Sequence, residues 1–133
     1  MGMLDHEKLD VYQRALELLD HIDVIREALP AGCAYLKDQL DRAAISVVLN
    51  IAEGAGEYSP ADKHRFYRMA RRSATETAAV LDILGRRRLA STEQVRGSKD
   101  LLARIVSMLV RMIQAPMRSG RGRGKGRGTE QPV

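Results

Sequence analysis

The basic residues of this chain gather in two stretches, and both could bind phosphate groups. Residues 60–88 hold eight basic and three acidic residues, and residues 118–133 carry a net +4 of the chain's total of +5. Lysine and arginine bind nucleic acids mainly through the phosphates, with little dependence on base sequence. The nucleic-acid-binding candidates are therefore Lys63, Arg65, Arg68, Arg72, Arg86, Arg87, Arg88, Arg121, Arg123, Lys125 and Arg127.

Both stretches also have a plainer interpretation. Charged residues on a helix often form only a solvated face, although Tyr67 lies among the arginines and could stack on a base. Residues 116–133 alternate arginine with glycine, which predicts a disordered tail. Such a tail suits single-stranded RNA or DNA, or it serves solubility alone, and the sequence leaves both roles open.

The segment Ala43–Ala52 reads AAISVVLNIA and is apolar on nearly every side of a helix. A surface helix needs only one apolar stripe, and a helix that is apolar all round is buried all round. A single small bundle cannot cover such a helix completely. We therefore expect another copy of the chain to cover part of it.

Polar residues interrupt this apolar helix at intervals of four, four and three. At this spacing they lie along one side of the helix, where two polar residues of the next helix could face them. Buried polar groups must be hydrogen-bonded, so the sequence predicts a shared network that either fixes helix register and the subunit joint or forms a functional pocket. Its members are Arg42, Ser46, Asn50, Glu53, Ser73 and Glu76.

Apolar residues recur at three and four over most of the chain and predict four helices, at about residues 5–29, 33–55, 60–88 and 91–114. Ser59 and Ser91 are expected N-caps, and Gln94 completes a capping box with Ser91. Gly54 and Gly56 are expected helix terminators. Four long helices with short joins predict an all-α fold, an up-down-up-down antiparallel bundle spanning residues 1–115.

The segment from Gln39 to Glu76 resembles one known family. It contains an RAA-x-S segment followed by NIAEG, then Ser73 and Glu76. In these residues the chain is similar to the small bacterial bundle proteins encoded in intervening sequences of large-subunit ribosomal RNA genes. A related branch is the accessory variability determinant of diversity-generating retroelements. Val48 stands where the family often has proline, which predicts a straighter second helix here.

The resemblance implies a homopentameric ring of bundles and nucleic-acid binding, with a reverse transcriptase as partner in the retroelement branch. The charge pattern agrees with a ring. Residues 5–29 hold seven acids and three bases, whereas residues 60–88 are basic, and these two helices are diagonal neighbours in the expected bundle. An acidic face that meets a basic face on the next copy makes a head-to-tail contact, and such contacts can close into rings. Both faces could equally be merely solvated.

Enzyme chemistry has little support in the sequence, and we expect no catalysis, no metal and no cofactor. Glu17 and His21 lie one turn apart, but no Glu-x-x-His motif accompanies them, and Cys33 is the sole cysteine. No apolar run is long enough to cross a bilayer, so a cytoplasmic protein is expected. The sequence favours an RNA-binding oligomer, and the alternative is an adaptor ring that binds a partner protein such as a reverse transcriptase.

Overall fold

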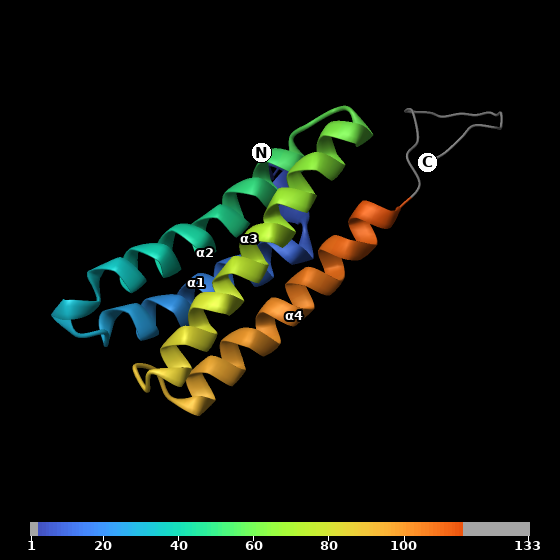
Figure 1. Ribbon diagram of the computed structural model, residues 1–133. Helices are drawn as coiled ribbons and strands as arrows, with labels where there is room; N and C mark the ends of the chain where they lie inside the picture. Colours follow the sequence, from blue (N-terminus) through green and yellow to red (C-terminus); the bar gives the residue numbers. More distant parts are fainter. Residues whose placement is uncertain (1–2, 116–133) are drawn as a thin grey trace, which may run out of the picture.

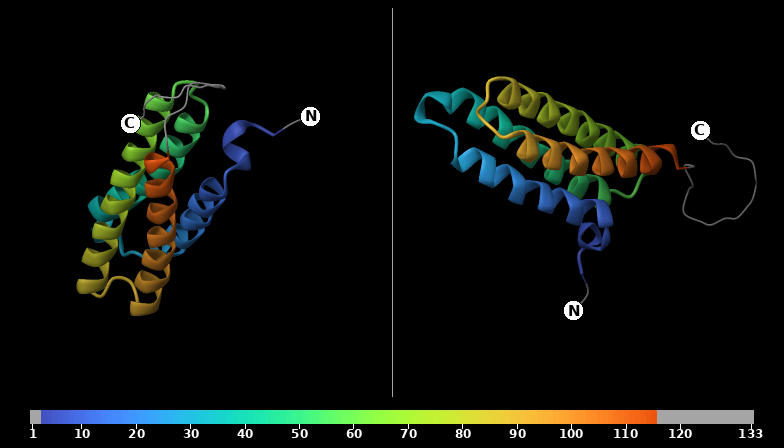
Figure 2. Two further views of the ribbon diagram at one scale, coloured as in Figure 1. Left: turned by 90° about the vertical axis from the view of Figure 1, so that its right-hand side faces the viewer. Right: turned by 90° about the horizontal axis from the view of Figure 1, so that it is seen from below.

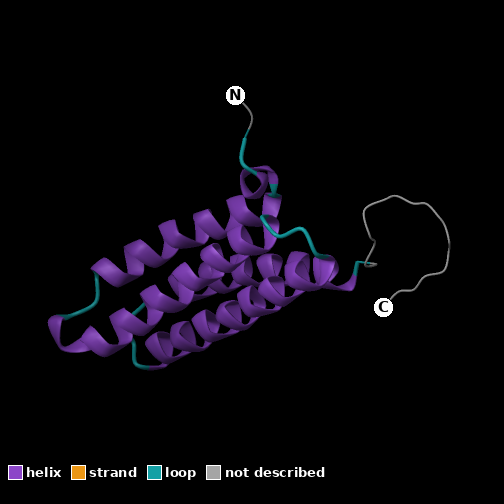
Figure 3. Ribbon diagram, turned by 90° about the horizontal axis from the view of Figure 1, so that it is seen from above, coloured by secondary structure: helices purple, strands orange, loops and turns teal. Residues whose placement is uncertain are grey.

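The computed structural model describes residues 3–115, which form helices and contain no strand (Figure 3). The elements in chain order are η1 (Asp5–Lys8), α1 (Asp10–Glu27), η2 (Ala31–Cys33), α2 (Ala34–Ala55), α3 (Pro60–Arg86) and α4 (Thr92–Gln114). The elements η1 and η2 are short 3-10 helices. The predicted all-α fold class is confirmed.

The helices run up, down, up and down along one long axis (Figures 1 and 2). Each α-helix packs against its neighbours in the chain, and α4 returns to pack against α1. Helices α1 and α3 therefore lie on one diagonal of the bundle, and α2 and α4 lie on the other. Short connections force consecutive helices to be antiparallel neighbours, as the sequence predicted.

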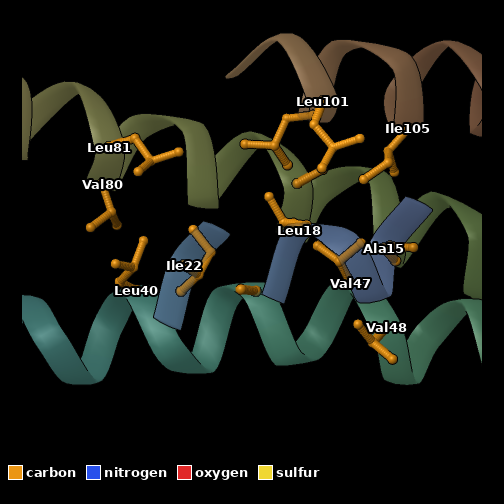
Figure 4. Packing of buried hydrophobic residues seen from close by; sticks show 14 of the residues in the cluster. Ala15, Leu18, Ile22, Leu40, Val47, Val48, Val80, Leu81, Leu101 and Ile105 are labelled. Carbon is orange, nitrogen blue, oxygen red and sulfur yellow. The ribbon is translucent and has the colours of Figure 1, made fainter. Parts of the chain in front are cut away.

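The core draws aliphatic side chains from all four helices (Figure 4). Leu18, Leu40, Leu81 and Ile105 each come from a different helix and are fully buried. Burying a side chain of this size stabilises the fold by about 1.5–3 kcal/mol. The apolar stripes that predicted the helices are thus the surfaces that hold the bundle together.

The starts of α3 and α4 follow the predicted caps. The Ser59 hydroxyl accepts the backbone N–H of Asp62 at 3.3 Å, and Pro60 occupies the first helical position. The Ser91 hydroxyl accepts the N–H of Gln94, and the Gln94 side chain accepts the N–H of Ser91, both at 3.0 Å. These bonds satisfy N–H groups that a helix start otherwise leaves unpaired.

Three helix ends differ from the predicted bounds, and one of them is the end of α1, which lies at Glu27 rather than at about residue 29. The first helix is not continuous from residue 5, because Leu9 is extended (φ −85°, ψ 128°) between η1 and α1. The Leu4 N–H donates to Glu7 Oε1 at 3.0 Å and closes η1 as a separate turn. Helix α3 ends at Arg86 rather than at residue 88, and Arg88 adopts a left-handed backbone (φ 61°) that turns the chain toward α4.

Within residues 3–115, none of the helices combines the length and the apolar composition that a membrane span requires. The predicted tail, residues 116–133, lies outside the described residues.

Candidate nucleic-acid interface

The outer face of α3 carries a shallow groove lined mainly by arginine. Its volume is about 690 Å³. Arg68 and Arg72 are exposed, Arg71 is half-buried, and none of the three forms an ion pair with another described residue. Arginines without carboxylate partners keep their hydrogen-bond donors free for phosphate oxygens. The lining residues are Arg65, Arg68, Met69, Arg71, Arg72, Thr75, Glu76 and Ala79.

Arg65 is held at the start of this groove by two contacts on its own helix. Its guanidinium lies 3.7 Å from Asp62 Oδ1, and its central carbon lies 4.5 Å above the ring of Phe66. The ion pair is exposed and contributes little to stability, and the ring keeps the guanidinium oriented. These two contacts restrict the orientation of the Arg65 guanidinium.

Lys63, the first of the predicted basic residues, is occupied elsewhere. Its ammonium donates to the carbonyl oxygens of Gly54 at 3.3 Å and Ala55 at 3.0 Å. These carbonyls end α2, where a positive charge complements the helix dipole. The structure therefore places Lys63 as a cap on α2 and outside the arginine groove.

A second basic groove, of about 900 Å³, lies where α3 turns into α4. Arg86 and Arg87 line it together with Arg96 of α4, whereas Arg88 is exposed beside it in the turn. Asp82 of α3 and Lys99 of α4 also line the groove and form a 2.6 Å ion pair, and Asp100 adds a second carboxylate to the lining. Arg96 was missing from the sequence-based candidates, because it stands alone in α4 and only the fold brings it to the others.

Tyr67 was predicted wrongly as a stacking residue. It is 5% exposed and packs in the core, and burial raises the pKa of its hydroxyl above the ordinary 10.0. Its ring lies against Gly54, where an added Cβ would come within 2.6 Å of Tyr67 Cε1. Of the two expected terminators, Gly56 is the C-cap of α2, and Gly54 lies inside the helix, which continues to Ala55. Glycine is needed at position 54 to admit the ring.

Three of the six predicted network residues are hydrogen-bonded to one another, and one of these contacts links α2 to α3. Ser46 Oγ lies 2.8 Å from Ser73 Oγ. Asn50 Nδ2 donates to the Ser46 carbonyl at 2.9 Å and to Ser46 Oγ at 3.0 Å. The buried Thr77 hydroxyl extends the chain of contacts by donating to the Ser73 carbonyl at 2.8 Å.

The other three members, Arg42, Glu53 and Glu76, do not join this network. All three are exposed, and Arg42 approaches only Asp38 on its own helix, at 3.9 Å. The prediction of one shared buried network of six is therefore corrected to a network of Ser46, Asn50 and Ser73.

The α2–α3 side of the bundle exposes large apolar side chains. Ile45 and Leu49 of α2 are 38% and 58% exposed, and Met69 of α3 is 39% exposed. The Ser46–Ser73 contact fixes the register of the two helices, so Leu49 and Met69 lie at similar heights in the bundle. The protomer alone leaves this part of the Ala43–Ala52 segment uncovered.

Among residues 3–115, no cluster of three or more His, Cys, Asp or Glu side chains could hold a metal ion. The remaining binding candidates, Arg121, Arg123, Lys125 and Arg127, lie outside the described residues.

Comparison with known proteins places the fold and the family. A crystal structure of a protein of unknown function from the S23 ribosomal protein family of Bacteroides thetaiotaomicron superposes with a TM-score of 0.73. The two chains are 24% identical, and the match covers 79% of this chain and 99% of the other. No curated protein matches the chain. The family model of the 23S rRNA-intervening sequence protein matches residues 7–111, so the chain belongs to the 23S rRNA-intervening sequence protein family.

Proposed function

We propose that the protein is an RNA-binding subunit of a homo-oligomeric ring, a pentamer, that acts in the cytoplasm without catalysis. The observation that carries the proposal is the groove of Arg65, Arg68, Arg71 and Arg72 on α3. Four arginines with one glutamate form a surface for phosphate groups, which supply most of the affinity in sequence-independent binding.

The exposed apolar side chains of α2 support the oligomeric part of the proposal. Ile45 and Leu49 offer a second copy an apolar surface within the Ala43–Ala52 segment. Repetition of the arginine groove around a ring would add avidity.

The C-terminal cations are a second proposed contact with RNA. Arg121, Arg123, Lys125 and Arg127 alternate with glycine, a composition that binds single strands through phosphate contacts and stacking. Deletion of residues 118–133 separates this contribution from that of α3.

Fluorescence anisotropy with a labelled RNA tests the proposal. The double variant Arg68→Gln/Arg72→Gln should bind at least 10-fold more weakly than the wild type at low salt. The control is Arg104→Gln, which removes an exposed arginine of α4 and should change affinity less than twofold. Equal affinity of all three proteins would overturn the proposed role of α3.

An adaptor ring is the second candidate function, with a partner protein such as a reverse transcriptase. The exposed Ile45 and Leu49 favour it, because an apolar patch can dock any complementary protein surface. Binding to such a partner would saturate, survive deletion of residues 118–133 and depend only weakly on salt. RNA binding would instead weaken steeply as salt rises.

A further inference from the structure

The two basic grooves follow one another along α3, since the first is lined by residues from Arg65 to Ala79 and the second begins at Asp82. Arg68 belongs to the first groove and Arg86 to the second. They are eighteen residues apart, which is five full turns, so both project from the same side of the helix about 27 Å apart along its axis. Thr75 and Ala79, which lie between them, are exposed and short.

The surface around these arginines offers little for base stacking. Tyr67 is buried, and the Arg65 guanidinium covers a face of the Phe66 ring. Single strands are commonly held by bases stacked on aromatic rings. In a double helix the bases are stacked in the interior and the phosphates lie on the outside. Two arginine grooves on one α-helix can bind such phosphates without any base stacking.

The spacing also distinguishes between kinds of duplex. Along the outside of a double helix, the phosphates of one strand return to the same side once per turn. That distance is about 34–36 Å in B-form DNA, and it is shorter in the A-form that RNA adopts. The roughly 27 Å between the Arg68 and Arg86 backbone positions, at 1.5 Å per residue, is closer to the shorter repeat.

We infer that α3 lies parallel to the axis of double-helical RNA and binds phosphates one turn apart, through Arg68 and Arg72 and, further along the helix, Arg86 and Arg87. This inference rests on the proposed RNA-binding function and names its substrate class. It separates α3, which would bind duplexes, from residues 118–133, whose composition suits single strands.

Four labelled probes test the inference on the full-length protein by anisotropy. They are an RNA duplex of about 16 base pairs, the span of known duplex-binding domains, a DNA duplex of the same length, one RNA strand alone, and an RNA duplex of about 6 base pairs. The last is only ~20 Å long even at the B-form rise, too short to reach both grooves.

We expect the long RNA duplex to bind at least 5-fold more tightly than the DNA duplex and at least 10-fold more tightly than the short duplex. The single strand, which residues 118–133 are proposed to bind, should lose less affinity than the long RNA duplex when Arg86 and Arg87 are replaced. The variant Arg86→Gln/Arg87→Gln should lose most of the preference for the long over the short duplex and for RNA over DNA, while Arg104→Gln should keep both. Circular dichroism confirms that each variant is folded.

The outcomes separate the two claims. If binding requires Arg68 and Arg72 but the long RNA and DNA duplexes bind alike, or the single strand loses as much affinity as the long RNA duplex in Arg86→Gln/Arg87→Gln, the duplex inference fails and the proposed function stands. If Arg86→Gln/Arg87→Gln retains both preferences, the two-groove geometry is wrong. If no probe binds, the proposed function fails and the inference fails with it.

Discussion

The hydroxyl oxygens of Ser46 and Ser73 lie 2.8 Å apart and join α2 to α3 across the half-buried side of the bundle. Asn50 donates to the same Ser46 oxygen at 3.0 Å. This contact sets the relative height of the two helices that carry the exposed apolar side chains and the arginine grooves. The relative position of the surface proposed to bind RNA and the surface proposed to bind another copy therefore depends on this contact between α2 and α3.

A double-mutant cycle measures the contact. Ser46→Ala and Ser73→Ala should each lower the free energy of unfolding by about 0.5–1.5 kcal/mol, because each removes one hydrogen bond and leaves a partner less well paired. The double variant should lose less than the sum of the two, since the residues interact. Urea denaturation provides the measurement, and strictly additive losses would show that the hydroxyls do not interact.

Gly54→Ala should destabilise the bundle, because the new Cβ would lie 2.6 Å from Tyr67 Cε1 and 3.2 Å from Phe66 Cβ. Overpacking of this kind costs about 1–3 kcal/mol and should lower the Tm by several degrees. Gly56→Ala is the matched control, since a Cβ there meets only two carbonyl oxygens at 3.7 Å. Equal Tm values for Gly54→Ala and the wild type would show that the Tyr67 ring does not require glycine at position 54.

Alkaline pH should weaken the fold through Tyr67. Burial raises the pKa of its hydroxyl above 10.0 in the folded state, so the folded chain holds this proton at pH values where the unfolded chain loses it. Stability linked to Tyr67 is therefore complete below pH 10 and falls as pH rises above it. The Tm of Tyr67→Phe should drop less than that of the wild type between pH 9 and 11. Tyr58→Phe, which alters a fully exposed ring, should behave as the wild type does.

Leu49→Glu should dissociate the proposed ring while leaving the protomer folded. Leu49 is 58% exposed in the protomer, so a charge at this position should lower the stability of the isolated chain only slightly. In an interface the same charge would be buried without a partner, which strongly disfavours assembly. Sedimentation equilibrium should give five times the chain mass for the wild type and the chain mass for the variant. Val24→Glu changes an α1 residue of similar exposure, 59%, and should leave the assembly intact. A monomeric wild type would contradict the oligomer.

Much of the fold could be predicted from local sequence. Ser59, Pro60 and Ser91 define helix starts by hydrogen bonds within one turn, so no tertiary information is needed to locate them. The break at Leu9 was missed, because it depends on the local bond between Leu4 and Glu7 in a stretch whose apolar spacing also fits a continuous helix. The left-handed Arg88 was missed because arginine seldom adopts that conformation.

The candidate site was less predictable, because it depends on how far each position lies from the core. Each step of four residues advances a helix by about 40° beyond a full turn. Arg42 is therefore rotated by roughly 80° from Asn50 and lies in solvent, although the spacing seemed to align them. Tyr67 could have been placed correctly, since Ala70 and Ala74 follow it at three and seven on the core face. Arg96 could not have been placed, since only the packing of α4 on α3 brings it to Arg86.

The salt dependence of RNA binding tests the role of the α3 arginines most directly. Each phosphate contact contributes about 0.7 to the slope of log K against log salt for a single strand and about 0.9 for a B-form duplex. Anisotropy titrations at several salt concentrations should therefore give Arg68→Gln/Arg72→Gln a slope shallower than that of the wild type by roughly 1.4–1.8. The same slope for both proteins would show that these arginines touch no phosphate and would contradict the account.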